Sequence, residues 1–260
     1  MTTGISASGT FYVLNQKEQS IPIVFIHGVG LTYEIWQPQL DFFKNYSTLA
    51  YDILGHGKSS LDKQNISFDD FSDQLIKLIN ELNFQKIHLI GFSIGSLIAR
   101  NFATKFNDKL QSLVLLGSIY KRSEQQQKIV NERFNQAKRE LKLSKLALKR
   151  WFTDKYLENN PDTYNKISSI LSSNNMENFI KVYDLFVNHK NDEDFEKITV
   201  NTLIMTGEYD IGSTIEMSQQ LNKIIKNSQL QIIKNGKHLC GIECADDVNL
   251  TIKNFIDKNE

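Results

Sequence analysis

A single serine lies between two glycines in the stretch GFSIG, where Ser93 is the central residue of a G-x-S-x-G spacing. The preceding residues, KIHLIG, read as a buried strand, and the following ones predict a helix over about 94–106. A strand that turns so abruptly into a helix leaves no space for side chains at the flanking positions, which favours glycine there. The turn exposes the Ser93 hydroxyl and directs the backbone N–H of Ile94 toward it. This pattern is typical of a nucleophilic serine.

A neutral serine hydroxyl is a weak nucleophile and needs a neighbouring base. His238, in NGKHLCG, is the only histidine that follows every strand we predict. The chain order serine, acid, histidine that accompanies this serine motif selects it as the base. The other four histidines lie in the strand before the serine, in predicted turns, or in a long helical region: His88, His27, His56 and His189.

The base needs an acid that accepts a hydrogen bond from its ring and holds its tautomer. The stretch TGEYD follows a predicted strand and supplies two acids, Glu208 and Asp210. The strand that ends at Gly117 is followed by SIYKR, which contains no acid, and Asp52 precedes the serine in the chain. The residues alone therefore leave Asp210 and Glu208 open.

Attack by a serine on a carbonyl also needs a second N–H donor for the oxyanion that forms. The stretch FIHGVG ends a buried strand in a glycine-rich turn, which places the N–H of Val29 in a suitable position. An H-G-x-G sequence by itself is a weak signal, and its position upstream of GFSIG gives it weight.

The elements that must carry these residues alternate between apolar strands and amphipathic helices. This alternation predicts a parallel sheet covered on both faces. We expect strands within 10–14, 21–28, 47–57, 86–91, 110–118, 200–207 and 228–236, and helices over 67–82, 94–106, 213–225 and 246–258, with Ser67 as a helix N-cap. Residues 119–199 break the alternation and predict a helical insert over the carboxyl ends of the strands, where α/β sheets bind ligands.

The overall composition excludes several classes of protein. The 30 basic and 30 acidic residues cancel, so the net charge gives no reason to expect nucleic acid or an anionic membrane as partner. The N-terminal stretch MTTGISASGT has no signal-peptide pattern, and no run reaches about 18 apolar residues. Two cysteines, Cys240 and Cys244, suit a reducing compartment. We expect a cytoplasmic protein without a membrane partner.

His238, Cys240 and Cys244 form an H-x-C-x3-C sequence, which is not a usual zinc spacing. We therefore expect no metal site, and two small buried cysteines instead.

The chain resembles the α/β-hydrolase fold, in its cap-bearing single-domain branch. The segments that carry the resemblance span nearly all 260 residues: IVFIHGVG, YDILGHGKS, LIGFSIGSLIA, TLIMTGEYD and NGKHLCGIEC…VNLTIKNFI. The resemblance implies a mostly parallel eight-stranded sheet with helices on both faces and a helical cap inserted after strand 6. Residues 1–118 and 200–260 would form the core domain and residues 119–199 the cap.

Within this family the chain is most similar to 3-oxoadipate enol-lactonases and small carboxylesterases. The resemblance favours Asp210 over Glu208 and implies a site of five residues: nucleophile Ser93, acid Asp210, base His238, and the oxyanion donors Val29 and Ile94. It implies a serine hydrolase that cleaves a small-molecule ester or lactone through an acyl-enzyme, with no cofactor and no metal. Ser93 excludes the relatives that use an aspartate nucleophile. Ser96 departs from a glycine that is common in relatives, and we expect it only to tighten helix packing.

Two alternatives remain open at this point. A Ser-His-Asp site on this fold also serves C–C bond hydrolysis and cofactor-free haloperoxidation, and the scaffold also occurs in non-catalytic ligand-binding proteins. The insert should determine the substrate. Its aromatic residues could line an apolar pocket, although packing is the better expectation for most of them: Phe134, Trp151, Phe152, Tyr156, Phe179, Tyr183 and Phe186. The basic run KRELKLSKLALKR could attract a substrate carboxylate, but a solvated helix face is the better interpretation.

Overall fold

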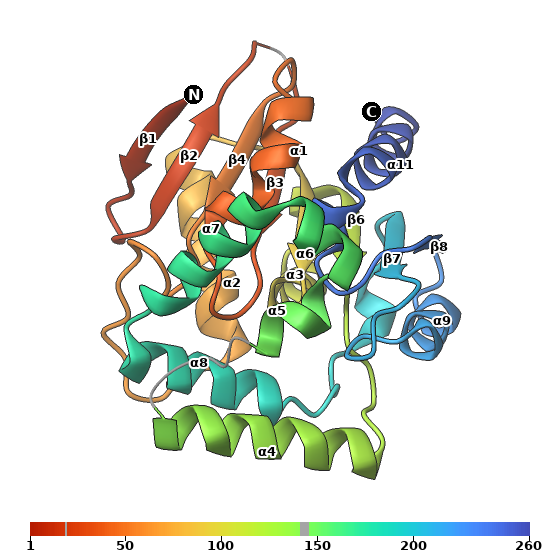
Figure 1. The fold of residues 1–260 in the computed structure, drawn as a ribbon. Helices are drawn as coiled ribbons and strands as arrows, with labels where there is room; N and C mark the ends of the chain where they lie inside the picture. Colours follow the sequence, from red (N-terminus) through yellow and green to blue (C-terminus); the bar gives the residue numbers. More distant parts are fainter. Residues whose placement is uncertain (19, 141–145) are drawn as a thin grey trace.

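The computed structural model describes residues 1–18, 20–140 and 146–260. In this part of the chain one sheet holds eight strands: β1 (Thr2–Ile5), β2 (Phe11–Asn15), β3 (Ile23–Ile26), β4 (Thr48–Tyr51), β5 (Ile87–Phe92), β6 (Leu110–Leu116), β7 (Thr202–Gly207) and β8 (Ser228–Ile233). Their spatial order is β1-β2-β4-β3-β5-β6-β7-β8. β2 pairs antiparallel with β1 and β4, and the later neighbours are all parallel. The predicted mostly parallel eight-stranded sheet is confirmed (Figure 1).

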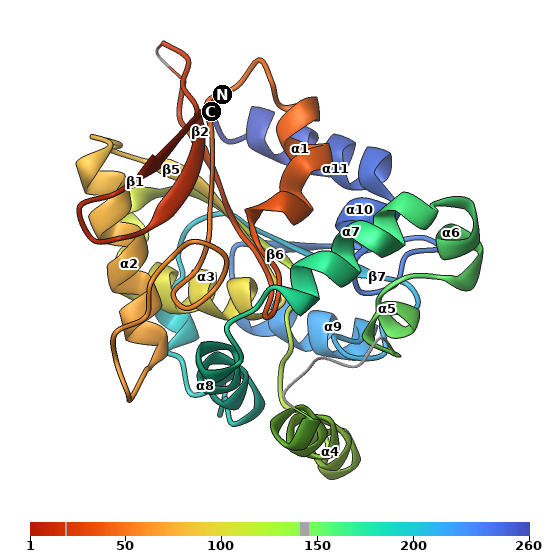
Figure 2. The same ribbon diagram turned by 60° about the vertical axis from the view of Figure 1, so that its left-hand side comes forward.

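Helices cover both faces of this sheet, because the central strands are apolar on both sides. In β3, Val24 and Ile26 pack toward one face, and Ile23 and Phe25 toward the other. The first face is covered by α2 (Phe68–Glu81), α3 (Ile94–Lys105) and α9 (Ile215–Ile224). The second face is covered by the 3-10 helix η1 (Tyr33–Trp36) and by α1 (Gln37–Phe42), α10 (Cys240–Glu243) and α11 (Ala245–Asp257). Figure 2 shows α2 on one side of the molecule and α1 with α11 on the other.

Most predicted boundaries of the core elements agree with the structure to within a few residues. The helix expected over 67–82 is α2, and the Ser67 N–H donates to the Asp70 carboxylate at 2.9 Å, as in a capping box. Strand β1 was not predicted. A short 3-10 helix, η2 (Asn107–Lys109), also connects α3 to β6.

The predicted helical region lies between β6 and β7. It contains α4 (Glu124–Glu140), α5 (Leu146–Trp151), α6 (Asp154–Asn159), α7 (Pro161–Ser172), α8 (Met176–Val187) and the 3-10 helix η3 (Phe195–Lys197). α4 and α8 lie side by side, at the end of the molecule opposite the two termini (Figures 1 and 2). Residues 141–145 of the predicted basic run lie outside the described residues. We use the name cap for residues 119–199.

Candidate active site

Ser93 lies in a tight turn between β5 and α3. Its backbone has φ 56° and ψ −120°, a conformation that costs a non-glycine residue about 1–3 kcal/mol and that tends to occur at functional sites. A methyl group added at Gly91 would lie 2.2 Å from the Gly95 carbonyl oxygen, and one at Gly95 would lie 2.4 Å from the Ile26 oxygen. The two glycines are therefore required because α3 begins in backbone contact with β5 and the end of β3.

Two hydrogen bonds join Ser93, His238 and Asp210. The Ser93 hydroxyl lies 3.2 Å from Nε2 of His238, and Nδ1 of the same ring lies 2.6 Å from Oδ2 of Asp210. The other carboxylate oxygen, Oδ1, accepts from the N–H groups of Gly212 at 2.8 Å and Ser213 at 3.0 Å. The aspartate is buried and its orientation is fixed by these bonds, so it can hold the imidazole with Nε2 facing the serine.

The structure places Glu208 away from this chain of hydrogen bonds. Its carboxylate accepts from the N–H of Asn235, in the turn that follows β8, at 2.9 Å. The end of β7 lies so close to the loop after β8 that a methyl group at Gly207 would lie 2.3 Å from the carbonyl oxygen of Lys237. This contact brings the loop that carries Asp210 next to the loop that carries His238.

Val29 and Ile94 present backbone N–H groups near the serine. Val29 lines the same cavity as Ser93, and Ile94 is the first residue of α3. Among the residues that the structure describes, no hydrogen bond from either N–H group is found. Two unsatisfied donors beside a serine hydroxyl have the arrangement that an oxyanion hole requires.

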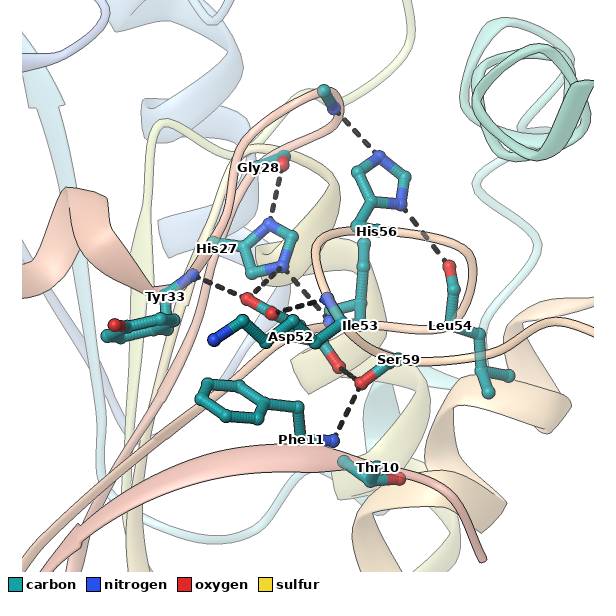
Figure 3. A network of polar contacts seen from close by, with 12 residues as sticks. Thr10, Phe11, His27, Gly28, Tyr33, Asp52, Ile53, Leu54, His56 and Ser59 are labelled. Carbon is teal, nitrogen blue, oxygen red and sulfur yellow. Dashed lines mark hydrogen bonds and ion pairs between the residues drawn. The ribbon is translucent and has the colours of Figure 1, made fainter. Parts of the chain in front are cut away.

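Two histidines outside this site hold the loop that carries Val29 (Figure 3). Nδ1 of His27 donates to the Gly28 oxygen at 2.8 Å, and its Nε2 accepts from the N–H of Ile53 at 3.0 Å. His56 accepts from the N–H of Gly30 at 2.8 Å. Both rings are completely buried, and this burial lowers the pKa of His27 to about 4 and of His56 to about 3. They are therefore neutral near pH 7.

Asp52 completes this network next to His27. Its carboxylate accepts from the N–H groups of Tyr33 and Lys58, both at 2.9 Å, and burial raises its pKa. From the sequence, His56 is expected in a turn without an assigned role, and Asp52 is not expected to be the acid because it precedes Ser93 in the chain. The only signal for this network is the pair of stretches FIHGVG and GHGKS, each with a histidine beside glycine.

The remaining histidines do not contact the serine. His88 is buried, and its Nδ1 lies 2.7 Å from the Ser112 hydroxyl in β6. His189 lies 3.1 Å from a carboxylate oxygen of Glu193, which also binds the buried Arg100. Each therefore takes part in packing or in an ion-pair cluster within the fold.

Ser93, Asp210 and His238 line a cavity of about 260 Å³ together with Val29 and side chains of the cap. Of the seven predicted cap aromatics, three line this cavity: Trp151, Tyr183 and Phe186. The other four pack elsewhere, Phe134 and Phe179 between α4 and α8, and Phe152 stacked on Tyr156. A second, more open hollow of about 690 Å³ has a mostly polar lining from α4 and the segment after α8 and contains none of the three linked residues.

The cysteines near His238 differ in burial. Cys240 is buried, as expected, whereas Cys244 is only half-buried, and burial raises the pKa of both thiols. In the described residues no group of three or more histidine, cysteine or acidic side chains is arranged to hold a metal ion. Across the same part of the chain, no helix combines the length and the apolar character that a bilayer crossing requires.

The sequence and the structure were compared with those of known proteins, and the matches agree on one family. A family model described as alpha/beta hydrolase fold matches residues 21–243. The chain is 28% identical over 261 residues to the (E)-2-((N-methylformamido)methylene)succinate hydrolase of Acinetobacter baylyi, covering 98% of this chain and 97% of that protein. It is 22% identical to 3-oxoadipate enol-lactonase 2 of the same organism, covering 89% and 86%. The crystal structure of the enol-lactonase from Burkholderia xenovorans superposes with a TM-score of 0.83 at 19% identity, covering 95% and 96%.

Proposed function

Because the chain belongs to the alpha/beta hydrolase fold family, we propose that it is a serine hydrolase that cleaves a carboxylic ester or lactone of a small molecule. The observation that carries this proposal is the pair of hydrogen bonds that links Ser93 through His238 to Asp210. Two of the relatives are named as hydrolases or lactonases of small compounds, which supports the same reaction class.

The proposed reaction begins when the Ser93 hydroxyl attacks the carbonyl carbon while Nε2 of His238 removes its proton. The N–H groups of Val29 and Ile94 stabilise the negative oxygen of the tetrahedral intermediate. His238 then gives its proton to the leaving alkoxide, and an acyl-enzyme remains on the serine. Water that is deprotonated by His238 releases the acid and restores the free hydroxyl.

The cap closes the other side of the proposed substrate site. We propose that residues 119–199 act as a cap over the carboxyl ends of the strands and determine which acyl compound is accepted. The cavity of about 260 Å³ suits a small substrate, and Trp151, Tyr183 and Phe186 contribute its apolar surface.

A fluorophosphonate probe tests the nucleophile. We expect it to label Ser93, and we expect no label on Ser93→Ala, because the probe reacts only with an activated serine. Folded wild-type protein that is not labelled would contradict the proposal.

Asp210 and Glu208 provide a matched pair for the acid. We expect Asp210→Asn to lower kcat for a p-nitrophenyl ester by roughly 10⁴-fold, since the amide favours the wrong imidazole tautomer. Glu208→Gln removes a similar charge two residues away, and because Glu208 bonds to Asn235 we expect less than a threefold change in kcat. If the two variants lost activity equally, the assignment of Asp210 would be wrong. Labelled Ser93 with no turnover of any ester would favour C–C bond hydrolysis.

A further inference from the structure

Three arginines of the cap line the cavity that contains Ser93. Arg122 precedes α4, Arg133 lies within α4, and Arg150 lies in α5. Among the described residues that line the cavity, Asp210 alone carries a carboxylate. That carboxylate already accepts hydrogen bonds from His238, Gly212 and Ser213, so it does not pair with the arginines. The cavity therefore carries more positive than negative charge beside the proposed nucleophile.

Arg122 has protein partners of its own. Its guanidinium group donates to the carbonyl oxygens of Phe186 at 3.3 Å and Val187 at 3.1 Å, and it lies 4.6 Å from the centre of the Phe186 ring. Burial lowers its pKa to about 10, so it remains charged at neutral pH. These contacts connect the start of α4 to the end of α8, and they leave Arg122 with a mainly structural role.

Arg133 and Arg150 have no such partners. Within residues 1–18, 20–140 and 146–260, no hydrogen bond or ion pair is found for either guanidinium group. Both side chains are half-buried. Burial lowers the pKa of Arg150, and the nearby positive charge of Arg133 lowers it further. Two partly desolvated like charges are unfavourable unless an anion compensates them.

Arg150 is fixed in position relative to the proposed base. Its two chain neighbours bind the His238 loop through their carbonyl oxygens: Lys149 accepts from Nζ of Lys237, and Trp151 accepts from the N–H of Leu239, both at 2.9 Å. The cap segment that presents Arg150 is thus attached to the loop that presents His238. A substrate group bound by Arg150 would be held at a defined place relative to Ser93.

We infer that Arg133 and Arg150 form an anion-binding subsite, and that the substrate is an ester or lactone that carries a free carboxylate. Two guanidinium groups suit a carboxylate because each offers paired N–H donors with matching geometry. The cavity is small, so the carboxylate must belong to the molecule whose carbonyl reaches Ser93. This inference rests on the proposed function and names its substrate class.

The sharpest test compares p-nitrophenyl half-esters of dicarboxylic acids with p-nitrophenyl esters of monocarboxylic acids of equal chain length. We expect the wild-type protein to prefer the half-ester by about 10- to 100-fold in kcat/KM, the effect of a charge-assisted pair. Arg133→Gln and Arg150→Gln should each reduce that preference, mainly by raising KM for the half-ester. Arg139→Gln is the matched control, because Arg139 is an exposed residue of α4 outside the cavity lining.

A binding measurement separates this inference from the proposed reaction. Isothermal titration of a saturated dicarboxylate into Ser93→Ala should show binding that is lost in Ser93→Ala/Arg150→Gln. Equal rates for charged and neutral esters, or an unchanged preference in both arginine variants, would overturn the subsite while leaving a labelled Ser93 hydrolase. Inorganic phosphate that binds where the dicarboxylate does not would also overturn it, since the anion would then be a phosphate. Absence of Ser93 labelling with intact, arginine-dependent dicarboxylate binding would reject the hydrolase proposal and keep the subsite.

Discussion

The loops at the strand ends and the cap contribute to the same cavity in different ways. The loops position Ser93, Asp210 and His238 through close backbone packing. At Gly95, just after Ser93, the backbone of β3 is so near that an added methyl group would lie 2.4 Å from the carbonyl oxygen of Ile26. The cap contributes side chains, among them Trp151. A position that is fixed by backbone contact tolerates no added atoms, whereas a side chain can be exchanged while its helix stays in place. We therefore expect the loops to determine whether the reaction occurs and the cap to determine which substrate reacts.

The largest effect on stability should come from adding one methyl group at the start of α3, directly after Ser93. Gly95→Ala places that methyl 2.4 Å from the Ile26 oxygen and 2.6 Å from the His27 oxygen, so α3 must move away from β3. We expect a loss of about 3 kcal/mol or more in the free energy of unfolding, measured with urea, and loss of fluorophosphonate labelling.

Gly241→Ala is the control for this variant. Gly241 is a buried glycine of α10, but a methyl there meets only Leu116 at 3.5 Å, an ordinary contact. We expect stability within about 0.5 kcal/mol of the wild type and normal labelling. If Gly95→Ala behaved like this control, backbone contact would not be what fixes the serine turn.

The contrast between backbone-fixed turns and side-chain packing also explains which features could be predicted from the sequence. The strand–turn–helix around Ser93 is predictable because a local steric requirement forces glycine at Gly91 and Gly95. The positions of the acid and of His238 follow from topology, since parallel strands bring their carboxyl ends to one edge of the sheet, but the choice of Asp210 over Glu208 rests on the family resemblance. The helical region between β6 and β7 follows from the interruption of a regular alternation. Short-range pattern and strand order are sufficient to predict these positions along the chain.

Other features depend on details of pairing and packing that no sequence pattern indicates. Strand β1 is mostly exposed and owes its place to antiparallel pairing with β2. The Ser96 hydroxyl donates to the backbone carbonyl oxygen of Ser93 at 2.5 Å, whereas the sequence suggested only tighter helix packing. The bond from Gly30 to His56 joins two separate loops. Trp151 and Phe152 are adjacent aromatics of the cap, and only the packing of α5 decides which one reaches the cavity.

The loop network around His27 and His56 should make the protein sensitive to acid. Both pKa values are lowered by burial, to about 4 and about 3, so between these values and the ordinary 6.5 the unfolded chain binds protons that the folded protein does not. The free energy of unfolding should therefore be highest above pH 6.5 and fall as the pH decreases. Each histidine should contribute a slope of about 1.4 kcal/mol per pH unit.

His56→Gln isolates this contribution. A glutamine oxygen can accept from the N–H of Gly30 much as Nε2 does, but the side chain does not titrate. We expect urea unfolding between pH 5 and 6 to show a slope smaller by about 1.4 kcal/mol per pH unit in the variant. The raised pKa of Asp52 acts in the opposite direction and is present in both proteins, so it cancels in the difference. Identical slopes would mean that His56 takes a proton in the folded state.

The smallest effect, and the one that examines the cap, concerns Trp151 and Phe152. Trp151→Leu enlarges the cavity beside His238, whose ring centre lies 6.4 Å from that of Trp151. We expect a shift in kcat/KM toward longer acyl chains of about fivefold, or about 1 kcal/mol, across a series of p-nitrophenyl esters.

Phe152→Leu replaces an aromatic ring by a smaller side chain at the next residue. The Phe152 ring is fully buried, stacks on Tyr156 and is not part of the cavity lining. It should lower the free energy of unfolding by about 1 kcal/mol and leave chain-length preference unchanged. Opposite responses at adjacent residues would show that selectivity depends on which side chain faces the cavity. A change of preference in both variants would instead mean that α5 shifts as a whole, and that the cap is coupled to the catalytic loops more tightly than side-chain contact alone requires.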